Sequence, residues 1–421
     1  MTLSRLHAAA AAGWLATAVT ARASDAPPAG FLASLDATAR IWAMAEASSS
    51  RGATPYAPAA ARAGIGAERG RGEAGLRLHM GGLTADVSVR SVASADQTLQ
   101  TKGVANELYD DLDVEGQHFT IGKRITSWDI GFGFRPLDVV QQEDRRAVHP
   151  FTLEGIPCLA WEWAGAETAL SLVYANPLRG RAAAAHDDES GALRLYQRIG
   201  GVDVHVVSRY SRRTELEAGV AGSIVVGDAL EVHASGRWQR RAERLVDARL
   251  GAAGAPLATS DPIGVRVSRD VVAALVGINL SPGWDLNLIA EGWIDPAGSA
   301  AAEWTAAEEL ADRQRASLGH GPPDGAVLGN LAWGLRLYDR SDPLRENLLL
   351  HLSRKFGRFE PTLDVLFTPE DRGWVATGAV AWQGEQVRLD AGARVFGGVP
   401  GAAYRAFPQS AVYFLAVQVY P

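Results

Sequence analysis

Apolar and polar residues alternate along successive segments of about ten residues, and these segments follow one another through most of the chain. Side chains of a β-strand point alternately to the two faces of a sheet, so each segment has one apolar and one polar face. The stretch Gln386–Val395 separates into Val387, Leu389, Ala391, Ala393 and Val395 on one face and Arg388, Asp390, Gly392 and Arg394 on the other. Asn330–Tyr338 divides in the same way, into Leu331, Trp333, Leu335 and Leu337 against Ala332, Gly334, Arg336 and Tyr338. The alternation predicts an all-β protein.

Charged residues at the centres of these segments decide between two all-β architectures. In a soluble β-sandwich the strand centres face a dry core, where an unpaired Arg or Asp is costly. In a transmembrane barrel one face of each strand meets lipid and the other lines water. The sequence therefore predicts a closed antiparallel transmembrane β-barrel.

The connections between segments alternate in length. Tight turns are expected at Gly81-Gly82, Gly200-Gly201, Val226-Gly227-Asp228 and Ser281-Pro282-Gly283, and long connections at about 95–104, 129–156, 176–190, 242–267 and 296–328. In bacterial barrels the short turns face the periplasm and the long loops face outward. We therefore expect both chain termini on the periplasmic side.

The segments number about nineteen, whereas a single-chain bacterial barrel has an even number of strands. We predict eighteen strands, with sixteen as the alternative, and attribute the surplus to the Ala-rich segment Leu32–Ala45 or to the final pair. Residues 302–317 have a helical composition and are expected to form a short helix in an outer loop.

The N-terminus carries the features of a secretory signal. Arg5 and His7 precede an apolar run from Ala8 to about Val19, and Ala21-Arg22-Ala23 resembles a cleavage site. We predict a signal peptide over residues 1–23 and a barrel domain over residues 24–421. A membrane anchor is the alternative, but the run is shorter than the ~20 residues that span a bilayer. Export without a helical span suits the outer membrane of a Gram-negative cell.

Charge and composition narrow the function. The net charge of −7 argues against a nucleic-acid partner. With nine His, one Cys and no recognisable catalytic or metal-binding spacing, we expect no cofactor, no metal and no enzymatic activity. The pair His233 and Ser235, on one strand face, is the catalytic alternative. The expected partners are outer-membrane lipid, a polar or anionic solute, and periplasmic or envelope-complex proteins.

Strand parity assigns a set of charged residues to the polar, lumen-facing side. The predicted pore-lining residues are Arg90, Arg124, Arg194, Arg198, Arg209, Arg237, Arg336, Arg388, Arg394, Asp86, Asp203, Glu231, Asp364 and Asp390. Two roles are open for them: an electrostatic lattice that stiffens the wall, or a ladder that replaces the hydration of a passing solute.

The connection Trp128–Pro157 is too long for a turn, and long loops without regular structure usually have a function. We hypothesise that it folds inward as a constriction loop, with the charged residues Asp138, Glu143, Asp144, Arg145 and Arg146. Arg145 and Arg146 would then face Asp203 or Glu231, the loop acids would meet lumen arginines, and deleting Val139–Val148 would raise conductance. A surface loop with internal ion pairs is the alternative.

The same region resembles a known group of proteins. Gly122-Lys123-Arg124, followed by Trp128, a glycine-aromatic run and the acidic-arginine sequence Glu143–Arg146, is similar to outer-membrane porin-like exporters of the alginate-export kind. The resemblance implies an eighteen-stranded barrel whose Arg-rich lumen passes an anionic polymer. The predicted function is a porin-like channel for polar or anionic solutes, including export of an exopolysaccharide. A structural or assembly barrel without conductance is the alternative.

Overall fold

The computed structural model describes residues 35–65, 68–94, 98–143, 147–176, 188–250, 256–340 and 342–420. The predicted signal peptide, residues 1–23, lies outside the described residues, as do Asp144, Arg145 and Arg146.

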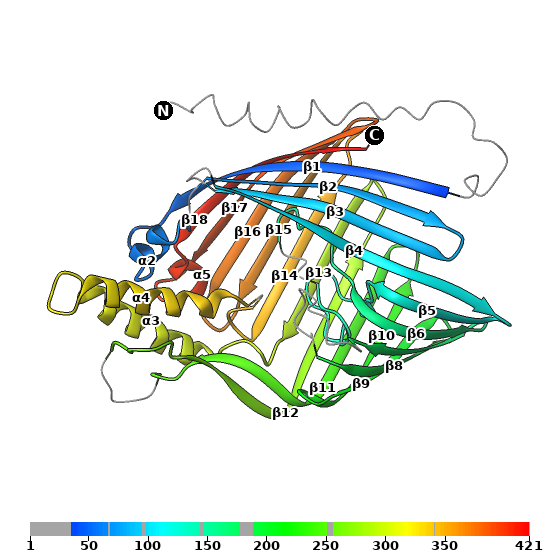
Figure 1. Cartoon of the computed structure of the whole chain (residues 1–421), viewed down its shortest axis with the longest axis horizontal. Coiled ribbons are helices and arrows are strands. Elements are labelled where there is room, and N and C mark those ends of the chain that lie inside the picture. Colours follow the sequence, from blue (N-terminus) through cyan, green and yellow to red (C-terminus); the bar gives the residue numbers. More distant parts are fainter. Residues whose placement is uncertain are drawn as a thin grey trace.

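The chain forms one closed antiparallel barrel of eighteen strands (Figure 1), which confirms the predicted fold class and strand number. Each strand pairs with its neighbours in sequence, and β1 pairs with β18 to close the ring. The strands are β1 (Leu35–Ser50), β2 (Arg69–Met80), β3 (Leu83–Ser94), β4 (Leu99–Val114), β5 (Gln117–Arg124), β6 (Ile156–Ala164), β7 (Thr168–Ala175), β8 (Ser190–Ile199), β9 (Val202–Ser211), β10 (Glu215–Val226), β11 (Leu230–Asp247), β12 (Ile263–Leu280), β13 (Leu286–Ile294), β14 (Glu346–Arg354), β15 (Phe359–Thr368), β16 (Gly373–Gln383), β17 (Val387–Gly398) and β18 (Gln409–Val419).

The two ends of the barrel differ as the connection lengths predict. Every even-numbered strand up to β16 is followed by a short turn, and these turns share one end with the N-terminus of β1 and the C-terminus of β18. Gly81, with φ of 62°, opens the turn between β2 and β3, and Gly200 and Gly201, with φ of 56° and 94°, form the turn between β8 and β9. Glycine adopts these angles without steric cost. The opposite end, which we call the loop end, carries the long connections.

Strand parity separates an apolar outer face from a polar inner face. Val220 of β10 and Leu172 of β7 point outward and are about half exposed, at 53% and 51%. Glu73 of β2, Arg209 of β9 and Glu291 of β13 point inward and are buried. The alternation that identified strands in the sequence is therefore the division between the two faces of the barrel wall.

The helices of the described chain gather at the loop end. They are α2 (Ala57–Arg62), α3 (Ala301–Ala316), α4 (Asp324–Leu335), the 3₁₀ helix η2 (Arg336–Tyr338) and α5 (Ala403–Ala406). The helix expected over residues 302–317 is α3. Within the described residues, no helix combines the length and the apolar character needed to cross a bilayer.

The predicted strand Asn330–Tyr338 is wrong, and it is the surplus segment. These residues belong to α4 and η2, whereas the Ala-rich first segment and the final pair are strands. The buried residues Val327, Leu331 and Leu335 recur every four positions, which is a helical period. The apolar positions of this stretch fit both the two-residue period of a strand and the period of a helix, and packing against α2 and α3 selects the helix.

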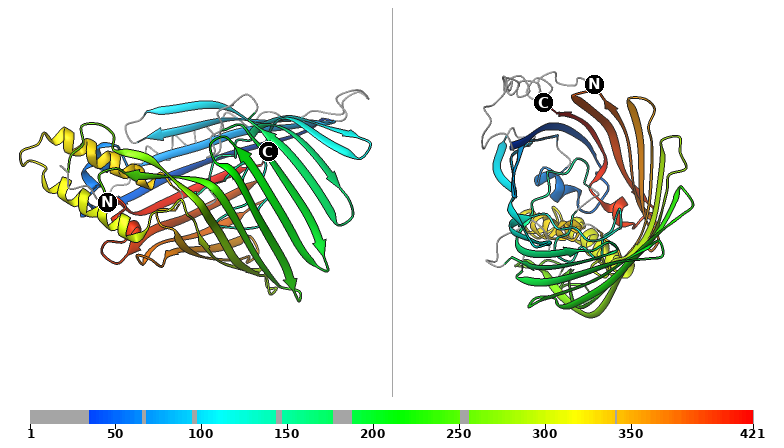
Figure 2. Two further views of the ribbon diagram at one scale, coloured as in Figure 1. Left: turned by 90° about the horizontal axis from the view of Figure 1, so that it is seen from below. Right: turned by 90° about the vertical axis from the view of Figure 1, so that its right-hand side faces the viewer.

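The four α-helices and their connections form a packed layer, which we call the cap. Tyr56 beside α2 lies against Leu331 of α4 and Ala311 of α3 in one apolar cluster. Trp304 of α3 packs with residues of β12 and α5 in a second cluster, which Tyr338 joins. Seen from the opposite end of the molecule, the helices lie within the outline of the ring of strands (Figure 2, right). The cap therefore covers part of the loop-end opening.

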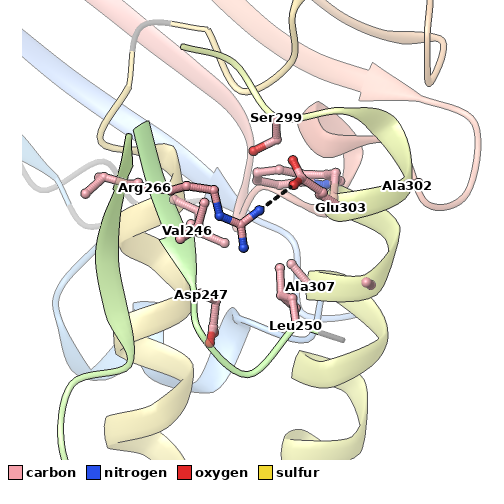
Figure 3. Close-up of a pocket in the computed structure, with 12 residues that line it drawn as sticks. Val246, Asp247, Leu250, Arg266, Ser299, Ala302, Glu303 and Ala307 are labelled. Carbon is pink, nitrogen blue, oxygen red and sulfur yellow. Dashed lines mark hydrogen bonds and ion pairs between the residues drawn. The ribbon is translucent and has the colours of Figure 1, made fainter. Parts of the chain in front are cut away.

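Ion pairs tie the cap to the longest hairpin. Arg244 of β11 donates two hydrogen bonds to Glu303 of α3, at 2.5 and 2.7 Å, and Arg266 of β12 lies 3.5 Å from the same carboxylate. Arg266 and Glu303 line a pocket of about 250 Å³ between this hairpin and α3 (Figure 3). The adjacent guanidinium of Arg244 lowers the pKa of Glu303 to about 2.

A second acid of α3, Glu308, has the opposite environment. Glu308 is 9% exposed, and its Oε1 accepts a hydrogen bond from Trp304 Nε1 at 3.2 Å. Burial raises the pKa of Glu308 to about 7, and the negative charges of Asp312 and Asp371 act in the same direction. Ionising Glu308 therefore works against the packed cap.

We predict that the cap loses stability as the pH rises towards 8. The pKa of Glu308 is about 7 in the folded protein and about 4.5 in the unfolded chain. The stability that its protonated form contributes to the cap is therefore complete below pH 4.5 and is lost as the pH rises through 7. The loss is roughly 3 kcal/mol by linkage. Hydrogen exchange of the α3 amides, corrected for intrinsic rates, should show falling protection between pH 5 and 8 in the wild-type chain and constant protection in Glu308→Gln.

Glu309→Gln is the matched control, because Glu309 is the exposed neighbour on the same helix. It should keep the wild-type pH dependence. Equal behaviour of the two variants would contradict the assignment to Glu308.

Candidate functional site: the inside of the barrel

The connection between β5 and β6, described over residues 125–143 and 147–155, turns into the barrel, and we call these residues the inner loop. Its amides at Phe132 and Gly133 donate to the two oxygens of Glu291 on β13, at 2.6 and 2.7 Å. Phe134 stacks on Trp293 of β13 with ring centroids 5.8 Å apart. The loop thus leaves β5 and reaches a wall strand far around the ring.

Two aspartates of the inner loop stabilise its turn. Asp138 Oδ1 accepts hydrogen bonds from the backbone N–H groups of Trp128 and Asp129, at 2.6 and 2.9 Å. Asp129 in turn accepts from the N–H groups of Ile130 and Leu137. The guanidinium of Arg135 lies 3.2 Å from Asp138. The expectation that Asp138 meets lumen arginines is therefore wrong, because its partners belong to the loop itself.

The next part of the inner loop packs on the wall through apolar side chains. Leu137, Val139 and Val140 are almost completely buried. They form one cluster with small inward-facing residues of β6–β10: Cys158, Ala160, Val173, Ala175, Ala192, Val207 and Ala221. Small side chains on these strands leave room for the loop inside a wall of fixed diameter. The buried side chain of Cys158 is one of the wall residues that the loop packs against.

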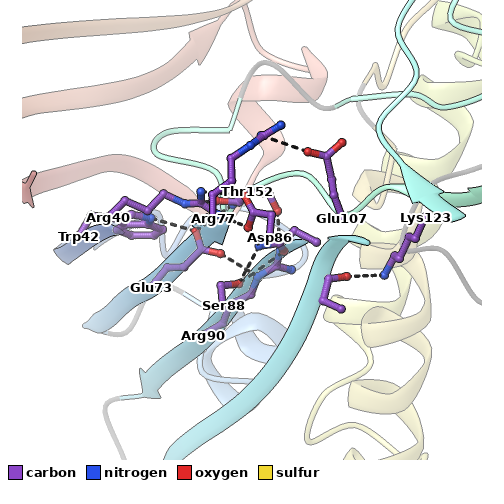
Figure 4. Close-up of polar contacts among 12 residues, drawn as sticks. Arg40, Trp42, Glu73, Arg77, Asp86, Ser88, Arg90, Glu107, Lys123 and Thr152 are labelled. Atoms are coloured by element: carbon purple, nitrogen blue, oxygen red, sulfur yellow. Dashed lines mark hydrogen bonds and ion pairs between the residues drawn. The ribbon is translucent and has the colours of Figure 1, made fainter. Parts of the chain in front are cut away.

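The last part of the inner loop is bound by β1–β3. Arg71 of β2 donates to the carbonyl oxygen of Val148 at 2.8 Å. Both the N–H and the hydroxyl of Thr152 donate to Glu73 at 2.9 Å, as part of the polar network in Figure 4. His149 lies 3.5 Å from Asp390 of β17. With its contacts to β13 and to β1–β3, the inner loop crosses the interior of the barrel.

Charged residues beneath the two anchored parts of the loop pair with one another. On β1–β4, Arg40 makes two hydrogen bonds to Asp86, at 2.6 and 2.8 Å, and Arg90 bonds to Glu73 at 3.2 Å (Figure 4). On the opposite side, Arg209 of β9 bonds to Glu217 of β10 at 2.7 Å, with both side chains fully buried. A buried charge without a partner is strongly destabilising, so each member of these pairs depends on the other.

The predicted pore-lining residues divide into three groups. Asp364, Asp390 and Arg394 line an open cavity inside the barrel. The other strand residues of the set share the inner-face parity without lining that cavity: Arg90, Arg124, Arg194, Arg198, Arg209, Arg237, Arg388, Asp86, Asp203 and Glu231. Arg336 is a correction: it lies on η2, pairs with Asp261 outside the wall strands, and has no place on the inner face.

The cavity has a volume of about 750 Å³ and lies between the inner loop and the wall formed by β14–β18, β1 and β2. At the loop end the cap contributes Tyr338, Tyr404 and Phe407 to its lining. Its lining combines charged residues with aromatic rings: Glu46, Arg69, Arg71, Arg340, Asp364, Asp390 and Arg394, and Phe132, Tyr338, Phe396, Tyr404, Phe407 and Phe414. The interior is therefore divided into a side filled by the inner loop and a side that stays open.

Several residues that build the site have weak signals in the sequence. Arg40 and Glu73 lie in Ala- and Gly-rich segments where the alternation of polarity is poor. Arg340 follows the stretch mistaken for a strand. Inner-face parity could have identified the first two once β1, β2 and β3 are paired, because Arg40 shares that face with Asp86 and Glu73 shares it with Arg90.

The candidate catalytic pair has structural partners instead. His233 Nε2 lies 3.0 Å from Glu291, and Ser235 Oγ lies 3.4 Å from Asp129 of the inner loop. Both side chains are buried inside the barrel and not at its outer surface. Among the described residues, no group of three or more His, Cys, Asp or Glu side chains is arranged to hold a metal ion.

Comparison with known proteins adds little to this geometry. No family model matches the chain, and no curated protein matches it either. Among solved structures, a triple mutant of the Rhodopseudomonas blastica porin aligns with 92% of this chain and 100% of its own, at 12% identity and a TM-score of 0.44. A chain described under "Asymmetric conductivity of engineered proteins" aligns over the same shares, at 10% identity and a TM-score of 0.43. At this level of similarity no family and no activity follow for the chain.

We predict that Glu291→Gln loosens the inner loop from β13. Gln keeps the shape of Glu, but its amide oxygen is a weaker acceptor than a carboxylate oxygen, and its second polar atom is a donor facing another donor. A loss of about 1–2 kcal/mol in the free energy that holds the loop against β13 corresponds to a roughly 5–30-fold larger population of the detached loop. Hydrogen exchange at the amides of Phe132 and Gly133 measures this change directly.

Glu231→Gln is the matched control for this variant. Like Glu291→Gln, it removes one negative charge from the inner face of the wall. The carboxylate of Glu231 lies 3.7 Å from His233 Nδ1 and does not accept from the amides of Phe132 and Gly133. Similar exchange rates in both variants would mean that net charge, and not the hydrogen bonds, holds the loop.

Proposed function

We propose that the chain is a porin-like channel that passes polar or anionic solutes across the outer membrane of a Gram-negative bacterium. The observation that supports this function best is the open cavity of about 750 Å³, lined by charged residues, inside a closed wall whose outer face is apolar. A wall of this kind matches a lipid environment outside and water inside. The short turns and both termini then face the periplasm, after removal of a signal peptide at residues 1–23.

In this proposal the inner loop is the constriction. It occupies one side of the interior and leaves solutes the side lined by β14–β18, β1 and β2. Arg394, Asp364 and Asp390 are then the members of the predicted set that a solute meets, while the remaining charged residues form the lattice that holds the loop and the wall. Asp144, Arg145 and Arg146 belong to the proposed constriction by sequence alone.

The alginate-export resemblance adds a narrower version of the same proposal, in which the solute is an exopolysaccharide leaving the cell. Arginines at the open side, including Arg69, Arg71 and Arg394, suit an anionic chain. Block of the channel by a polyuronate, but not by a neutral glucan of the same length, would support this version.

A structural or assembly barrel without conductance is the second candidate. The packing of the inner loop on β6–β10 and the cap over the loop end favour it, because both reduce the open cross-section. A barrel of this kind would act through periplasmic or envelope-complex partners. Electrical recording separates the two candidates.

We predict discrete conductance steps when the purified chain is inserted into a planar lipid bilayer. Because Val139 and Val140 anchor the inner loop to the wall, deleting Val139–Val148 would remove an anchor as well as the constriction. Replacing residues 142–147 by glycine and serine at equal length keeps Val139, Val140 and the contact of His149 with Asp390, and removes side-chain volume. This variant should conduct more than the wild type, because the passage is wider. A silent wild-type barrel would favour the structural candidate.

We also predict that a charge on the outer face is costly in lipid. Val220→Arg, near the middle of β10, should lower the free energy of unfolding in phospholipid vesicles by about 2–4 kcal/mol, because Arg is poorly solvated at the bilayer midplane. Urea titration of the vesicle-inserted barrel measures the loss. Val220→Ala controls for lost packing and should cost far less. An Arg variant as stable as the Ala variant would show that this face does not meet lipid.

A further inference from the structure

The outer face of the barrel changes where β9–β12 approach the loop end. Its central part is apolar: Val220 of β10 and Val272 of β12 are both more than half exposed. Two aromatic residues lie on the same face, since Tyr210 is opposite the exposed Leu216 and Trp238 is opposite Val272 in the strand register. Tyr and Trp are typical of the border between a lipid-facing belt and the headgroup layer. The two rings therefore mark this border on β9 and β11.

The alternation of inner and outer residues shifts by one position directly beyond these rings. On β11, Gln239 and Ala242 are both buried. The two residues between them, Arg240 and Arg241, therefore lie on the outer side of the strand. On β12 the shift coincides with Asp270, whose φ of 53° lies in the left-handed region that Asp tolerates better than most residues. The shift brings charged residues of both strands to the outer face.

Arginines outnumber acids in this part of the outer face and in the adjoining turn between β9 and β10. The residues, which we call the arginine cluster, are Arg212, Arg213, Arg240, Arg241 and Arg269, with Glu215, Glu243 and Asp270. Each of the three acids pairs with an arginine, at nitrogen–oxygen distances of 2.7, 2.8 and 3.5 Å. Arg212 and Arg269 are exposed, and within the described chain neither pairs with a carboxylate. The cluster therefore has an excess of positive charge.

The ion pairs of the cluster can exchange one partner for another. The side chains of Arg240 and Asp270 are 43% and 49% exposed, and exposed pairs contribute little to stability. A guanidinium in such a pair can turn to a phosphate, which accepts paired N–H hydrogen bonds. The pair of Arg209 with Glu217 inside the barrel, by contrast, is fully buried and fixed. The cluster is therefore able to bind an anion without disturbing the wall.

The cluster occupies one sector of the wall. β11 and β12 form the longest hairpin and run up to the cap helices (Figure 1). On β4, β7 and β13 the outward residues nearest the loop end are Leu99, Tyr174 and Ile294, which carry no charge. An anionic lipid beside the barrel is therefore attracted more strongly to the sector of β9–β12 than to these strands.

We infer that the arginine cluster binds a diphosphorylated glycolipid of the outer leaflet, the class to which lipid A belongs. The inference rests on the proposed function in one respect, because it takes the loop end as the outward side of the membrane. In such a lipid the phosphates lie directly above the acyl chains, as the arginines lie directly beyond Trp238, Tyr210 and the apolar wall. Several guanidinium groups side by side suit two phosphates on one headgroup, whereas a phospholipid offers only one.

Titration of the purified full chain in a neutral detergent with lipid A, read out by native mass spectrometry, tests the site. Lipid A without its phosphates supplies the same acyl chains without charge, and phosphatidylglycerol supplies a single phosphate. Lipid A should bind roughly tenfold more tightly than either lipid, and equimolar inorganic phosphate should leave it bound. Equal binding of the dephosphorylated lipid would overturn the role of the arginines. Equal binding of phosphatidylglycerol, or displacement by inorganic phosphate, would overturn the assignment to a diphosphorylated glycolipid.

Variants of the cluster test the residues that carry the binding. The double variant of Arg240→Gln with Arg269→Gln should weaken lipid A binding about tenfold. Arg269→Gln alone should also weaken binding and leave the unfolding temperature unchanged, because Arg269 pairs with no described carboxylate. Arg358→Gln, at an exposed arginine in the turn between β14 and β15, removes the same charge at the other end and should bind like the wild type. Wild-type binding by the double variant would overturn the proposal. If that variant does not fold, Arg269→Glu takes its place with the same expectation of weaker binding.

Recording in planar bilayers separates this inference from the proposed function. A wild-type chain that binds lipid A but shows no conductance steps would leave the lipid site standing and remove the channel. A chain that conducts but does not prefer lipid A would keep the channel and remove the lipid site.

Discussion

Hydrogen bonds that backbone amides donate to carboxylates hold the interior of this barrel together. In a closed sheet the wall strands use their backbone groups on one another, so few remain for a segment that runs through the inside. The described residues of the inner loop form no helix or strand, yet their buried N–H groups must be satisfied. Glu291 and Glu73 from the wall, and Asp129 and Asp138 from the loop, supply the acceptors. Without them, the loop has no stable position across the lumen.

The placement of these acids determines much of the remaining charge pattern. Glu73 lies 3.2 Å from the guanidinium of Arg90, and Glu291 lies 3.0 Å from the imidazole of His233, so both wall acids that accept from loop amides also contact a second side chain of the wall. The buried pair Arg209–Glu217 extends the same principle to wall strands under the loop. Most of the charged residues of the inner face therefore serve the position of the loop and the wall, and only a minority faces the open cavity.

The barrel follows from the sequence because its signals are local, whereas the site depends on contacts between distant strands. Alternation along each strand and short glycine turns predicted the closed antiparallel barrel, and the rule of an even strand number reduced about nineteen segments to eighteen. Leu331 and Leu335 were misassigned because their spacing fits two periods, and burial against Tyr56 selects the helix. The partners of Asp138 follow from a turn that strand parity does not describe. Arg340 was missed because it lies outside every strand.

The inner loop also explains why the two halves of the wall have different inward-facing residues. Under the loop, β6–β10 carry small apolar residues such as Cys158, Val173 and Ala192, because larger or charged side chains would compete with Leu137 and Val139 for the same space. Across the cavity, β14–β17 present His351, Asp364 and Arg394 to open space. A charge on the covered half is obliged to find a partner in the wall, whereas a charge on the open half can exchange its partner for a solute. In the proposed channel, selectivity is therefore expected to depend on the open half and on the cap residues above it.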